Sequence, residues 1–452
     1  MKHYEVIIIG AGSAGLSAAQ TLKEHKIKYA IVEQGAGGTL CATTGCMPSK
    51  ALVDAAHTYH MRKKFDSFGI EGSEKVTANI PRILQHVRNH RDYFVTEVLE
   101  SMKNEPIIHG HAHFCDTSTI EINAEKYSAD AIIICTGSYP HIPQPLRALE
   151  NDIITTDNLF DQTELPSSIA VVGLGSSGLE LAQALSRLGI KVYGLKAGNS
   201  FAGINDPLIN STIQSLLSEE FQINLESKIE PAEKTESGFS LKVKDNIIQA
   251  EGLLVTAGRS PNLKNLGLEN TSITLNEDGI PVYDKLTMQI EGQPIYIAGD
   301  VNADRALQHE AIIEGHIAAL HAIGKKHEAL RDIKLNIVFT DPPIATVGKG
   351  QENLEIEDFA TGNTSFKYQS RAILMEENHG QIRLYANPEN QTLTGGAFIA
   401  PAADHMAHFL ALAISKNMTA QELLNMPFYH PVLEEGLYTA LEQLAQDLKK
   451  AA

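Results

Sequence analysis

Apolar residues are grouped along the chain in short runs that alternate with segments of helical spacing. The first run, Tyr4 to Ile9, leads at once into a glycine-rich turn and then into the helix-forming stretch LSAAQTLKEH. A second short run, Lys28 to Val32, follows and ends in Glu33. A strand, a helix and a second strand of this kind form one βαβ unit of a parallel sheet, so this part predicts an α/β fold.

The same order of elements returns in the middle of the chain. Ile169 to Val172 leads into a second glycine-rich turn, which is followed by the helical LELAQALSRLG and by the strand Lys191 to Leu195. Three further apolar segments end in tight turns, at residues 131–138, 253–262 and 295–300. The repeated unit predicts two dinucleotide-binding domains in one chain.

The segments around these units differ in character. The stretch from about Ala51 to Lys103 predicts helix with a solvated face. From about Ile333 onward, strand-like segments with polar alternation precede the helical AADHMAHFLALAISKNM. The whole pattern therefore predicts an α/β protein with two Rossmann-like domains plus an α+β C-terminal domain.

Composition narrows the classes of function. A chain of 452 residues that is 43% hydrophobic can bury a large core, and it is expected to form two to four domains. The net charge of −18 argues against binding of nucleic acid or of an anionic membrane surface. Glu5 interrupts the N-terminal apolar run and no run is long enough to span a membrane, so a cytoplasmic location is expected.

Both glycine-rich turns carry the pattern G-x-G-x-x-G, which suits a dinucleotide. The glycines are Gly10, Gly12 and Gly15 in the first turn and Gly173, Gly175 and Gly178 in the second. A strand that ends in this pattern directs backbone N–H groups toward a pyrophosphate, and Glu33 can accept hydrogen bonds from ribose hydroxyls. Two complete motifs indicate electron transfer between two cofactors. A duplicated domain with one inactive site is the less favoured alternative.

Two of the four cysteines, Cys41 and Cys46, lie in the run GGTLCATTGCMPSK after the first unit. Residues five apart on a regular helix have Cα atoms roughly 8 to 9 Å apart, which exceeds the span of a disulfide. A helix must therefore begin or distort between them, and Gly45 permits this. Taken alone, the pair is either a redox-active disulfide beside a dinucleotide or two packed thiols. Cys115 and Cys135 are expected to be packing residues.

These motifs occur in order with the segments CTGS, AGRSPN, AGD and FTDPPIATVG. Together with the C-x4-C-x3-K run, they make the chain resemble the class I FAD-dependent pyridine nucleotide-disulfide oxidoreductases over nearly its full length, and most of all the dihydrolipoyl dehydrogenase branch. The resemblance implies an FAD-binding domain in two parts (residues 1–145 and 269–332), an NAD(P)-binding domain (146–268) and a dimerisation domain (333–452) that forms a homodimer.

The resemblance also assigns roles at the reaction centre. Cys41 matches the thiol that exchanges with substrate, and Cys46 matches the thiol that lies against the flavin. Lys50 is placed near flavin N5 and is paired with Glu180. The resemblance thus favours the redox-active disulfide.

An acid/base pair is implied near the C-terminal end. His430, in the run FYHPVLEE, matches the family's catalytic histidine. Glu435, five residues later, matches the carboxylate that sets the histidine tautomer. In the family this dyad acts on the disulfide of the other subunit, so a monomer is expected to be inactive.

Cofactor contacts are implied at further positions. Besides Lys50 and Glu180 they are Gly10, Gly12, Gly15, Glu33, Thr136, Gly137, Ser138, Gly173, Gly175, Gly178, Lys196, Gly258, Arg259, Gly299 and Asp300. Lys196 departs most from the family, because NAD-preferring relatives carry a glutamate there. The lysine either pairs with the 2′-phosphate of NADP or points to solvent and leaves NAD in use.

The predicted function is that of a homodimeric flavoenzyme that oxidises dihydrolipoamide, or a similar dithiol, through the Cys41–Cys46 disulfide and FAD, with hydride passed to NAD+. A 2-oxoacid dehydrogenase complex is a candidate partner. Two alternatives are an NADPH-dependent reductase of another low-molecular-weight disulfide and a mainly structural docking subunit of a dehydrogenase complex. Mercuric reductase is disfavoured because the tail LAQDLKKAA has no vicinal cysteines, and no metal site is predicted.

Overall fold

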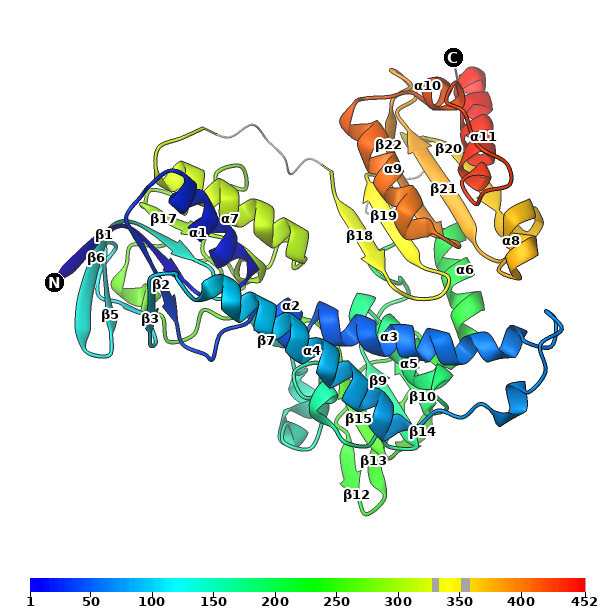
Figure 1. The fold of residues 1–452 in the computed structure, drawn as a ribbon, viewed down its shortest axis with the longest axis horizontal. Helices are drawn as coiled ribbons and strands as arrows, with labels where there is room; N and C mark the ends of the chain where they lie inside the picture. Colours follow the sequence, from blue (N-terminus) through cyan, green and yellow to red (C-terminus); the bar gives the residue numbers. More distant parts are fainter. Residues whose placement is uncertain (327–332, 351–357, 452) are drawn as a thin grey trace. The chain divides into compact units, whose positions relative to one another are not determined.

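The computed structural model describes residues 1–326, 333–350 and 358–451, and Figure 1 shows its ribbon coloured along the chain. The chain forms two compact units, each built from separate stretches of sequence. The first unit comprises Met1–Pro48, His86–His141 and Gly258–Arg331. The second unit comprises Ser49–Gln85, Ile142–Ala257 and Asp332–Ala452.

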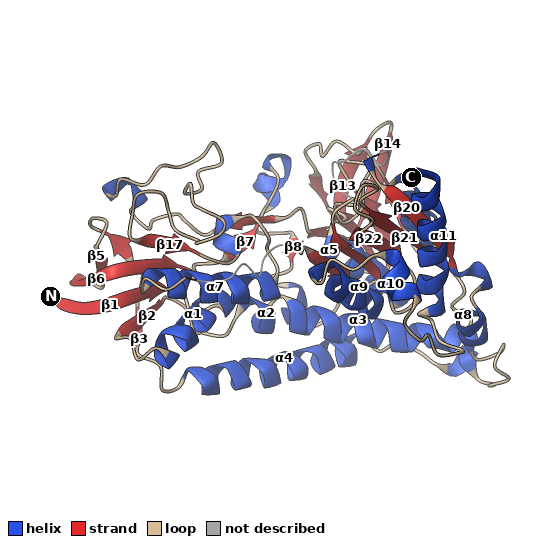
Figure 2. Cartoon of the chain, turned by 90° about the horizontal axis from the view of Figure 1, so that it is seen from above, coloured by secondary structure: helices blue, strands red, loops and turns tan. Residues whose placement is uncertain are grey.

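The first unit is built on a seven-stranded sheet of order β3-β2-β1-β6-β5-β4, in which β17 also pairs with β6. The strands are β1 (Lys2–Ile9), β2 (Tyr29–Glu33), β3 (Ile107–His109), β4 (His113–Phe114), β5 (Thr119–Ile122), β6 (Glu125–Ile134) and β17 (Ile295–Ile297). Strands β1, β2, β3, β6 and β17 run parallel, so their C-terminal ends share one edge. Helices α1 (Ser13–Glu24) and α7 (Gln308–Ala322) lie side by side (Figures 1 and 2).

Alternate residues of β1 face the two sides of this sheet. Val6 and Ile8 pack in one apolar cluster with residues of α1 and α7, whereas Ile7 and Ile9 pack in a second cluster. Because both faces of the sheet are covered, the buried C-terminal parts of its central strands β1 and β6 are continuously apolar. This is the physical reason for the apolar run from Val6 to Ile9.

The second unit contains another parallel sheet, of order β11-β10-β9-β15-β8. Its strands are β8 (Ile154–Thr155), β9 (Ser168–Val172), β10 (Lys191–Leu195), β11 (Gln222–Asn224) and β15 (Gly252–Val255). An antiparallel sheet precedes β15 in the chain and consists of β12 (Glu233–Thr235), β13 (Gly238–Val243) and β14 (Asn246–Ala250). Helix α5 (Ser176–Arg187) lies between β9 and β10 in the chain, so β9, α5 and β10 form the second predicted βαβ unit, and α6 (Pro207–Ser218) precedes β11.

The C-terminal part of the second unit has the predicted α+β character. Its antiparallel sheet, of order β18-β19-β22-β21-β20, contains β18 (Leu335–Val338), β19 (Ile344–Gly348), β20 (Ala360–Ser365), β21 (Gln381–Ala386) and β22 (Leu393–Ile399). The helices are α8 (Ser370–Met375), α9 (Ala403–Ser415), α10 (Ala420–Leu424) and α11 (Glu435–Ala451). Phe398 on β22, Leu410 on α9 and Leu437 on α11 belong to one buried cluster, so sheet and helices share a core.

The stretch predicted to be helical, from about Ala51 to Lys103, contains two long helices in the structure. Helix α3 covers Cys46–His60 and α4 covers Ile80–Met102. Between them lie Gly69 and Gly72, with φ of +72° and +97°. A 3-10 helix, Met61–Lys64, follows α3, and Ile70 N donates to the carbonyl oxygen of Phe65 at 2.7 Å around Gly69, so this glycine ends the helical run.

The predicted domain limits stay predictions. Residues 332 and 452, two of the predicted limits, lie outside the described residues. Within the described residues, none of the helices has the length and apolar character that a membrane crossing needs.

Candidate functional site

The turn between β1 and α1 is shaped by its glycines. Gly10 has φ +107°, and a Cβ there would lie 2.3 Å from the carbonyl oxygen of Cys135. A Cβ at Gly15 would lie 1.9 Å from the carbonyl oxygen of Gly10, so the fold itself needs both glycines. At Gly12 an added Cβ would meet no atom of the described residues within 4 Å. This position therefore leaves an open cradle at the start of α1.

A cavity of about 210 Å³ lies beside this turn. Its lining includes Gly12, Glu33, His111, Thr136 and Lys264. Both carboxylate oxygens of Glu33 are held by the backbone: Oε2 accepts a hydrogen bond from Ala11 N at 2.8 Å, and Oε1 accepts one from Gly35 N at 2.7 Å. Each oxygen has a further lone pair, so the oriented carboxylate can still bind hydroxyl groups.

A second cavity, of about 130 Å³, continues from the first. The residues that line both cavities are Gly12, Leu40, Cys135 and Gly137. Others that line the second cavity include Cys41, Cys46, Gly299, Asp300 and Gln308. The first unit therefore contains one cradle that extends from Glu33, past the glycine turn, to the two cysteines.

The two cysteines lie on either side of a break between helices. Cys41 belongs to the short helix α2 (Leu40–Thr43), and Cys46 is the first residue of α3. Gly45 lies in the break, where an added Cβ would be 2.9 Å from the carbonyl oxygen of Leu40. The expectation that a helix begins at this point is confirmed. Both sulfur atoms face one acceptor, because Gln308 Oε1 lies 3.0 Å from Cys41 Sγ and 4.0 Å from Cys46 Sγ.

Three of the predicted cofactor residues come together beside the cysteine cavity. Asp300 Oδ2 accepts a hydrogen bond from Ser138 Oγ at 2.8 Å, and Arg259 Nε donates to the same Ser138 Oγ at 2.8 Å. Ser138 and Arg259 lie on the paired strands β7 (Ser138–Pro140) and β16 (Arg259–Pro261). Gly258, with φ +100°, directly precedes β16. This strand pair orients the Asp300 carboxylate.

Glu314 on α7 is a site residue that the sequence did not reveal. Its side chain is buried, and Oε2 accepts hydrogen bonds from Gly299 N at 2.6 Å and from Asn302 Nδ2 at 2.7 Å. It therefore holds the turn that carries Asp300. Glutamates are rarely buried, and the apolar neighbours in the run IIEGHIAAL are the one signal that could have indicated burial here.

The second glycine-rich turn repeats the geometry of the first within the second unit. A Cβ at Gly173 would lie 2.5 Å from the carbonyl oxygen of Thr256, and one at Gly178 would lie 1.8 Å from that of Gly173. At Gly175 an added Cβ would again meet nothing within 4 Å among the described residues. The second turn thus offers the same kind of open cradle for a phosphate.

Lys196 directly follows β10, at the end of the strand where its role was predicted. Its backbone N donates to the carbonyl oxygen of Asn224 at 3.0 Å, and its own carbonyl accepts from Ser227 N at 2.8 Å. Burial lowers the pKa of the Lys196 ammonium. The backbone at this position is therefore held in place while the side chain is only half-buried.

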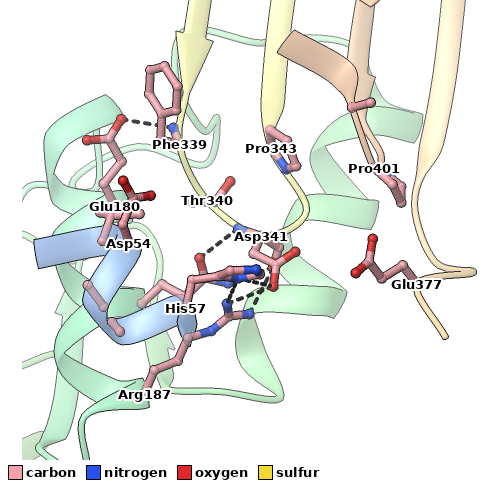
Figure 3. A pocket seen from close by; sticks show the side chains of 15 residues that line it. Asp54, His57, Glu180, Arg187, Phe339, Thr340, Asp341, Pro343, Glu377 and Pro401 are labelled. Carbon is pink, nitrogen blue, oxygen red and sulfur yellow. Dashed lines mark hydrogen bonds and ion pairs between the residues drawn. The ribbon is translucent and has the colours of Figure 1, made fainter. Parts of the chain in front are cut away.

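Lys50 and Glu180 form the ion pair that the sequence predicted. Lys50 Nζ lies 2.7 Å from Glu180 Oε2, and the Glu180 side chain is only 3% exposed. The other carboxylate oxygen, Oε1, accepts a hydrogen bond from Phe339 N at 2.9 Å (Figure 3). The Lys50 ammonium lies 4.8 Å from the centre of the Phe339 ring. Both oxygens of this buried carboxylate are thus paired.

His430 and Glu435 also come together. His430 Nδ1 lies 2.9 Å from Glu435 Oε1, and Oε2 accepts a hydrogen bond from Val432 N at 3.1 Å. The hydrogen bond with His430 holds the pKa of the Glu435 carboxyl below its usual range. The His430 side chain is 69% exposed, so its other ring nitrogen is accessible to a second molecule.

Gln369 supports this loop from the side opposite Glu435. Its Nε2 donates to the carbonyl oxygen of Val432 at 2.6 Å, and its Oε1 accepts from Ala372 N at 2.6 Å, which caps α8. Both backbone groups of Val432 are therefore held by side chains. A single glutamine before a short helix carries no motif, so sequence reasoning missed it.

A charged network lines a further cavity, of about 250 Å³, in the second unit (Figure 3). Arg187 binds the Glu220 carboxylate at 2.7 and 2.8 Å and Asp341 Oδ2 at 2.7 Å. His57 Nδ1 lies 3.1 Å from the same Asp341 oxygen, and the pKa of His57 is raised chiefly by this hydrogen bond. Burial raises the pKa of Asp341, but His57 and Arg187 together hold it well below its usual range. None of these residues was predicted from sequence.

The His57–Asp341 contact is expected to make stability depend on pH. Because the folded pKa of His57 is raised, its contribution is complete below about 6.5 and is lost as pH rises through the folded value. The contribution of Asp341 is complete above about 3.9 and is lost only in stronger acid. We therefore expect His57→Asn to lower the melting temperature most near about pH 5.5 and least near about pH 9, in thermal unfolding over a pH series.

A matched control for this series is His405→Asn, since the His405 side chain is 80% exposed. It should shift the melting temperature little at any pH. If His57→Asn lowered the melting temperature equally across the series, the role of the protonated histidine would be refuted.

Comparisons of sequence agree with these arrangements. Residues 4–321 match the pyridine nucleotide-disulphide oxidoreductase family, and residues 335–441 match the dimerisation domain of the same family. The dihydrolipoyl dehydrogenase of Geobacillus stearothermophilus is 31% identical over 453 residues, covering 97% of this chain and 95% of the relative. The mercuric reductase of Staphylococcus aureus is 28% identical over 461 residues, covering 99% of this chain and 83% of the relative.

Solved structures show the same fold. The HOCl-induced flavoprotein disulfide reductase RclA from Escherichia coli superposes with a TM-score of 0.85 at 22% identity, covering 97% of this chain and 99% of that one. LpdA from Mycobacterium tuberculosis superposes with a TM-score of 0.86 at 22% identity, covering 98% of this chain and 100% of that one. The α/β fold with two dinucleotide-binding parts and an α+β dimerisation part is thereby established.

Members of the matched family use FAD and NAD(P). The cradle of the first unit fits FAD, because Gly12 leaves room for a pyrophosphate and Glu33 presents an oriented carboxylate to a ribose. Asp300 and the two cysteines lie at the other end of this cradle. Gly175 leaves the corresponding room for the nicotinamide dinucleotide in the second unit.

Gly12→Ala is expected to separate cofactor binding from folding. The φ of Gly12 is −74° and nothing of the described residues lies near the added Cβ, so the fold should be unchanged. The new methyl group would occupy the space for the pyrophosphate, and we expect flavin affinity to fall by at least about tenfold. Flavin content by visible absorbance, beside circular dichroism, measures this.

Gly175→Ala is the matched variant in the second unit. It should retain flavin but raise the KM for the nicotinamide nucleotide. Wild-type flavin content in Gly12→Ala would exclude the first cradle as the FAD site.

Proposed function

Because this chain belongs to the pyridine nucleotide-disulphide oxidoreductase family, we propose that it is a dihydrolipoyl dehydrogenase, which oxidises dihydrolipoamide or a similar dithiol and reduces NAD+. Its family makes it a flavin-dependent oxidoreductase that acts on a sulfur group. The observation that carries the proposal is the meeting of Cys41 and Cys46 in a cavity continuous with the dinucleotide cradle. Similarity to the Geobacillus stearothermophilus enzyme supports the choice of dithiol.

The proposed reaction exchanges one disulfide for another. A thiolate of the substrate attacks Cys41 Sγ in the Cys41–Cys46 disulfide, so a mixed disulfide forms and Cys46 leaves as a thiolate. The second thiol of the substrate then attacks the substrate sulfur of the mixed disulfide. This releases the cyclic disulfide product and leaves Cys41 and Cys46 with the two electrons.

His430 is proposed to move the protons of this exchange. Its exposed ring nitrogen accepts the proton of the first substrate thiol and returns it to the Cys41 sulfur when the product leaves, and it then holds the proton of the second substrate thiol. Glu435 holds the other ring nitrogen at 2.9 Å and stabilises the protonated imidazole. Bound FAD supplies the two-electron acceptor between the protein dithiol and the nicotinamide.

The match to the dimerisation domain supports homodimer formation. We propose that His430 acts on the cysteine pair of the second copy, which agrees with the exposure of its side chain. Cys41→Ser and His430→Gln, each inactive alone, then complement each other in mixed dimers. Unfolding and refolding an equal mixture should restore roughly a quarter of wild-type activity, since half of the dimers hold one complete site. No recovery, with mixed dimers confirmed by mass spectrometry, would show that the dyad acts within its own chain.

The function is tested directly by initial rates. Lipoamide with NADH and glutathione disulfide with NADPH, measured in parallel, distinguish the proposed enzyme from a reductase of another small disulfide. Preference for lipoamide and NADH supports the proposal, and preference for glutathione disulfide and NADPH overturns it.

The reductase alternative is favoured by one observation, the cation Lys196 at the end of β10. A lysine there can bind the 2′-phosphate of NADPH but cannot accept hydrogen bonds from a ribose. Lys196→Glu should then abolish NADPH use and improve NADH use. If Lys196 instead points to solvent, the same variant leaves NADPH kinetics unchanged.

A mainly structural role in a dehydrogenase complex remains the alternative of another class. It would be favoured if the purified protein were colourless and could not be reconstituted with FAD. The complete cradle and both cysteines argue for the enzyme.

A further inference from the structure

Gln308 lies where the two cysteines meet. It is the first residue of α7, and its side-chain oxygen Oε1 lies 3.0 Å from Cys41 Sγ and 4.0 Å from Cys46 Sγ. It also lines the cavity of about 130 Å³ that holds both sulfurs. The glutamine belongs to none of the sequence motifs, and the reaction described above gives it no role.

The amide of Gln308 can distinguish a thiol from a thiolate. A thiol has a hydrogen to donate to the amide oxygen, whereas a thiolate only accepts. An oxygen directed at a sulfur atom therefore favours the protonated form of that sulfur. Because the oxygen is 1.0 Å closer to Cys41 than to Cys46 (3.0 Å against 4.0 Å), this preference is stronger at Cys41.

The reduced pair needs such a preference. When the disulfide takes up two electrons and one proton, one sulfur becomes a thiol and the other a thiolate. The two outcomes differ chemically. Only a Cys46 thiolate can pass electrons to the flavin, and Cys41 is the sulfur that is protonated when the product leaves. Among the described residues that line this cavity Asp300 is the charged side chain, and its Oδ2 accepts a hydrogen bond from Ser138 Oγ.

We propose that Gln308 is a positioning residue that keeps the shared proton on Cys41 and leaves Cys46 as the thiolate. The inference rests on the proposed function, because it requires the pair to cycle between disulfide and dithiol. The Gln308 amide thereby determines which of the two sulfurs is the thiolate after each reduction.

Gln308→Met tests the proposal with little change of shape, since methionine has a similar length but lacks the amide oxygen. The holoenzyme is reduced with dithiothreitol, and the alkylation rates of Cys41 and Cys46 by iodoacetamide are followed from about pH 5 to 10 by peptide mass spectrometry. We expect the Cys41 profile to move to lower pH by roughly half a unit to one unit, so that its rate at neutral pH rises about threefold to tenfold.

A second signal reports on Cys46. The long-wavelength absorption of thiolate beside flavin should weaken in Gln308→Met at neutral pH, because the proton is redistributed toward Cys46. Gln308→Glu keeps the acceptor oxygens and adds a negative charge, so it should move the Cys41 profile to higher pH. Gln20→Met is the matched control, since Gln20 is exposed on α1 and bonds to Glu24.

The outcomes separate this proposal from the proposed function. A Cys41 profile that is unchanged in Gln308→Met, or that moves to higher pH, overturns the role of the amide oxygen even when the enzyme oxidises dihydrolipoamide normally. Reduction by dithiothreitol does not depend on the physiological substrate. A shifted Cys41 profile without dihydrolipoamide turnover would support the role of Gln308 and overturn only the proposed substrate.

Discussion

Replacing Cys46 with serine is expected to reduce dithiol-dependent NADH production by about a thousandfold or more. A serine hydroxyl cannot form a disulfide with Cys41, so the pair can no longer accept electrons from a substrate dithiol. Cys41→Ser should have a similar effect, because the attacked sulfur is removed. The rate of NADH formation with dihydrolipoamide, at equal flavin content, measures the loss.

Cys115→Ser is the matched control, since Cys115 lies outside both cavities of the cradle. It should keep the wild-type rate. The oxidation of NADH by a small artificial dye should persist in Cys46→Ser, because the dye takes electrons from the flavin without the cysteines. Full dithiol activity in Cys46→Ser would refute the assignment of the redox pair.

The second large effect is expected at the His430–Glu435 dyad. His430→Gln removes the group that accepts the substrate proton, and we expect dithiol oxidation to fall by roughly 100-fold to 10,000-fold. Glu435→Gln should cost less, because the imidazole remains and loses only its partner at 2.9 Å. The pH profile of kcat/KM should distinguish the two variants.

The direction of this pH effect follows from the hydrogen bond. The pKa of Glu435 is lowered by His430, so the carboxylate stays charged in mild acid and the pair is lost only as pH falls through that lowered value. In Glu435→Gln the imidazolium that forms during the reaction lacks its charged partner at every pH, so the rate difference from wild type should be largest above the lowered pKa of Glu435 and should shrink in stronger acid. A rate difference that stays the same across the pH series would show that the charge of the Glu435 carboxylate does not assist the reaction.

His408→Gln on the exposed side of α9 provides the control for general effects of histidine loss. It should retain wild-type rates. Dye reduction by NADH should also survive His430→Gln, because it involves no dithiol proton. Loss of both activities in His430→Gln would indicate damage to the flavin site instead of the loss of a base.

Much of this site could be recognised in the sequence because its parts are local. The run from Gly10 to Gly15 and the run from Gly173 to Gly178 each form one turn, and the closest contact of an added Cβ at Gly15 or Gly178 lies within that turn. The pairs Lys50–Glu180 and His430–Glu435 were expected from the family resemblance, and the structure brings both pairs together. The roles of these residues in catalysis stay predictions.

Other parts could not be read from the sequence. Glu314 and Gln369 hold the turns that carry Asp300 and Val432, yet each is a single polar residue with no recurring spacing. Arg187 likewise binds Glu220, which is 33 positions away along the chain, and Asp341, which is 154 positions away. The stretch after Ala51 was predicted to be helical, and the structure divides it into α3 and α4, with Gly69 between them at a φ of +72°.

The sequence alone specified the two nucleotide cradles and the break between Cys41 and Cys46, because backbone sterics act among residues that are close along the chain. It could not specify what faces the two sulfurs. That was decided by the tertiary structure, which brings Gln308 to Cys41 across 267 residues. The packing of α7 on the first sheet sets this contact, and packing depends on the whole core instead of on any short run of residues.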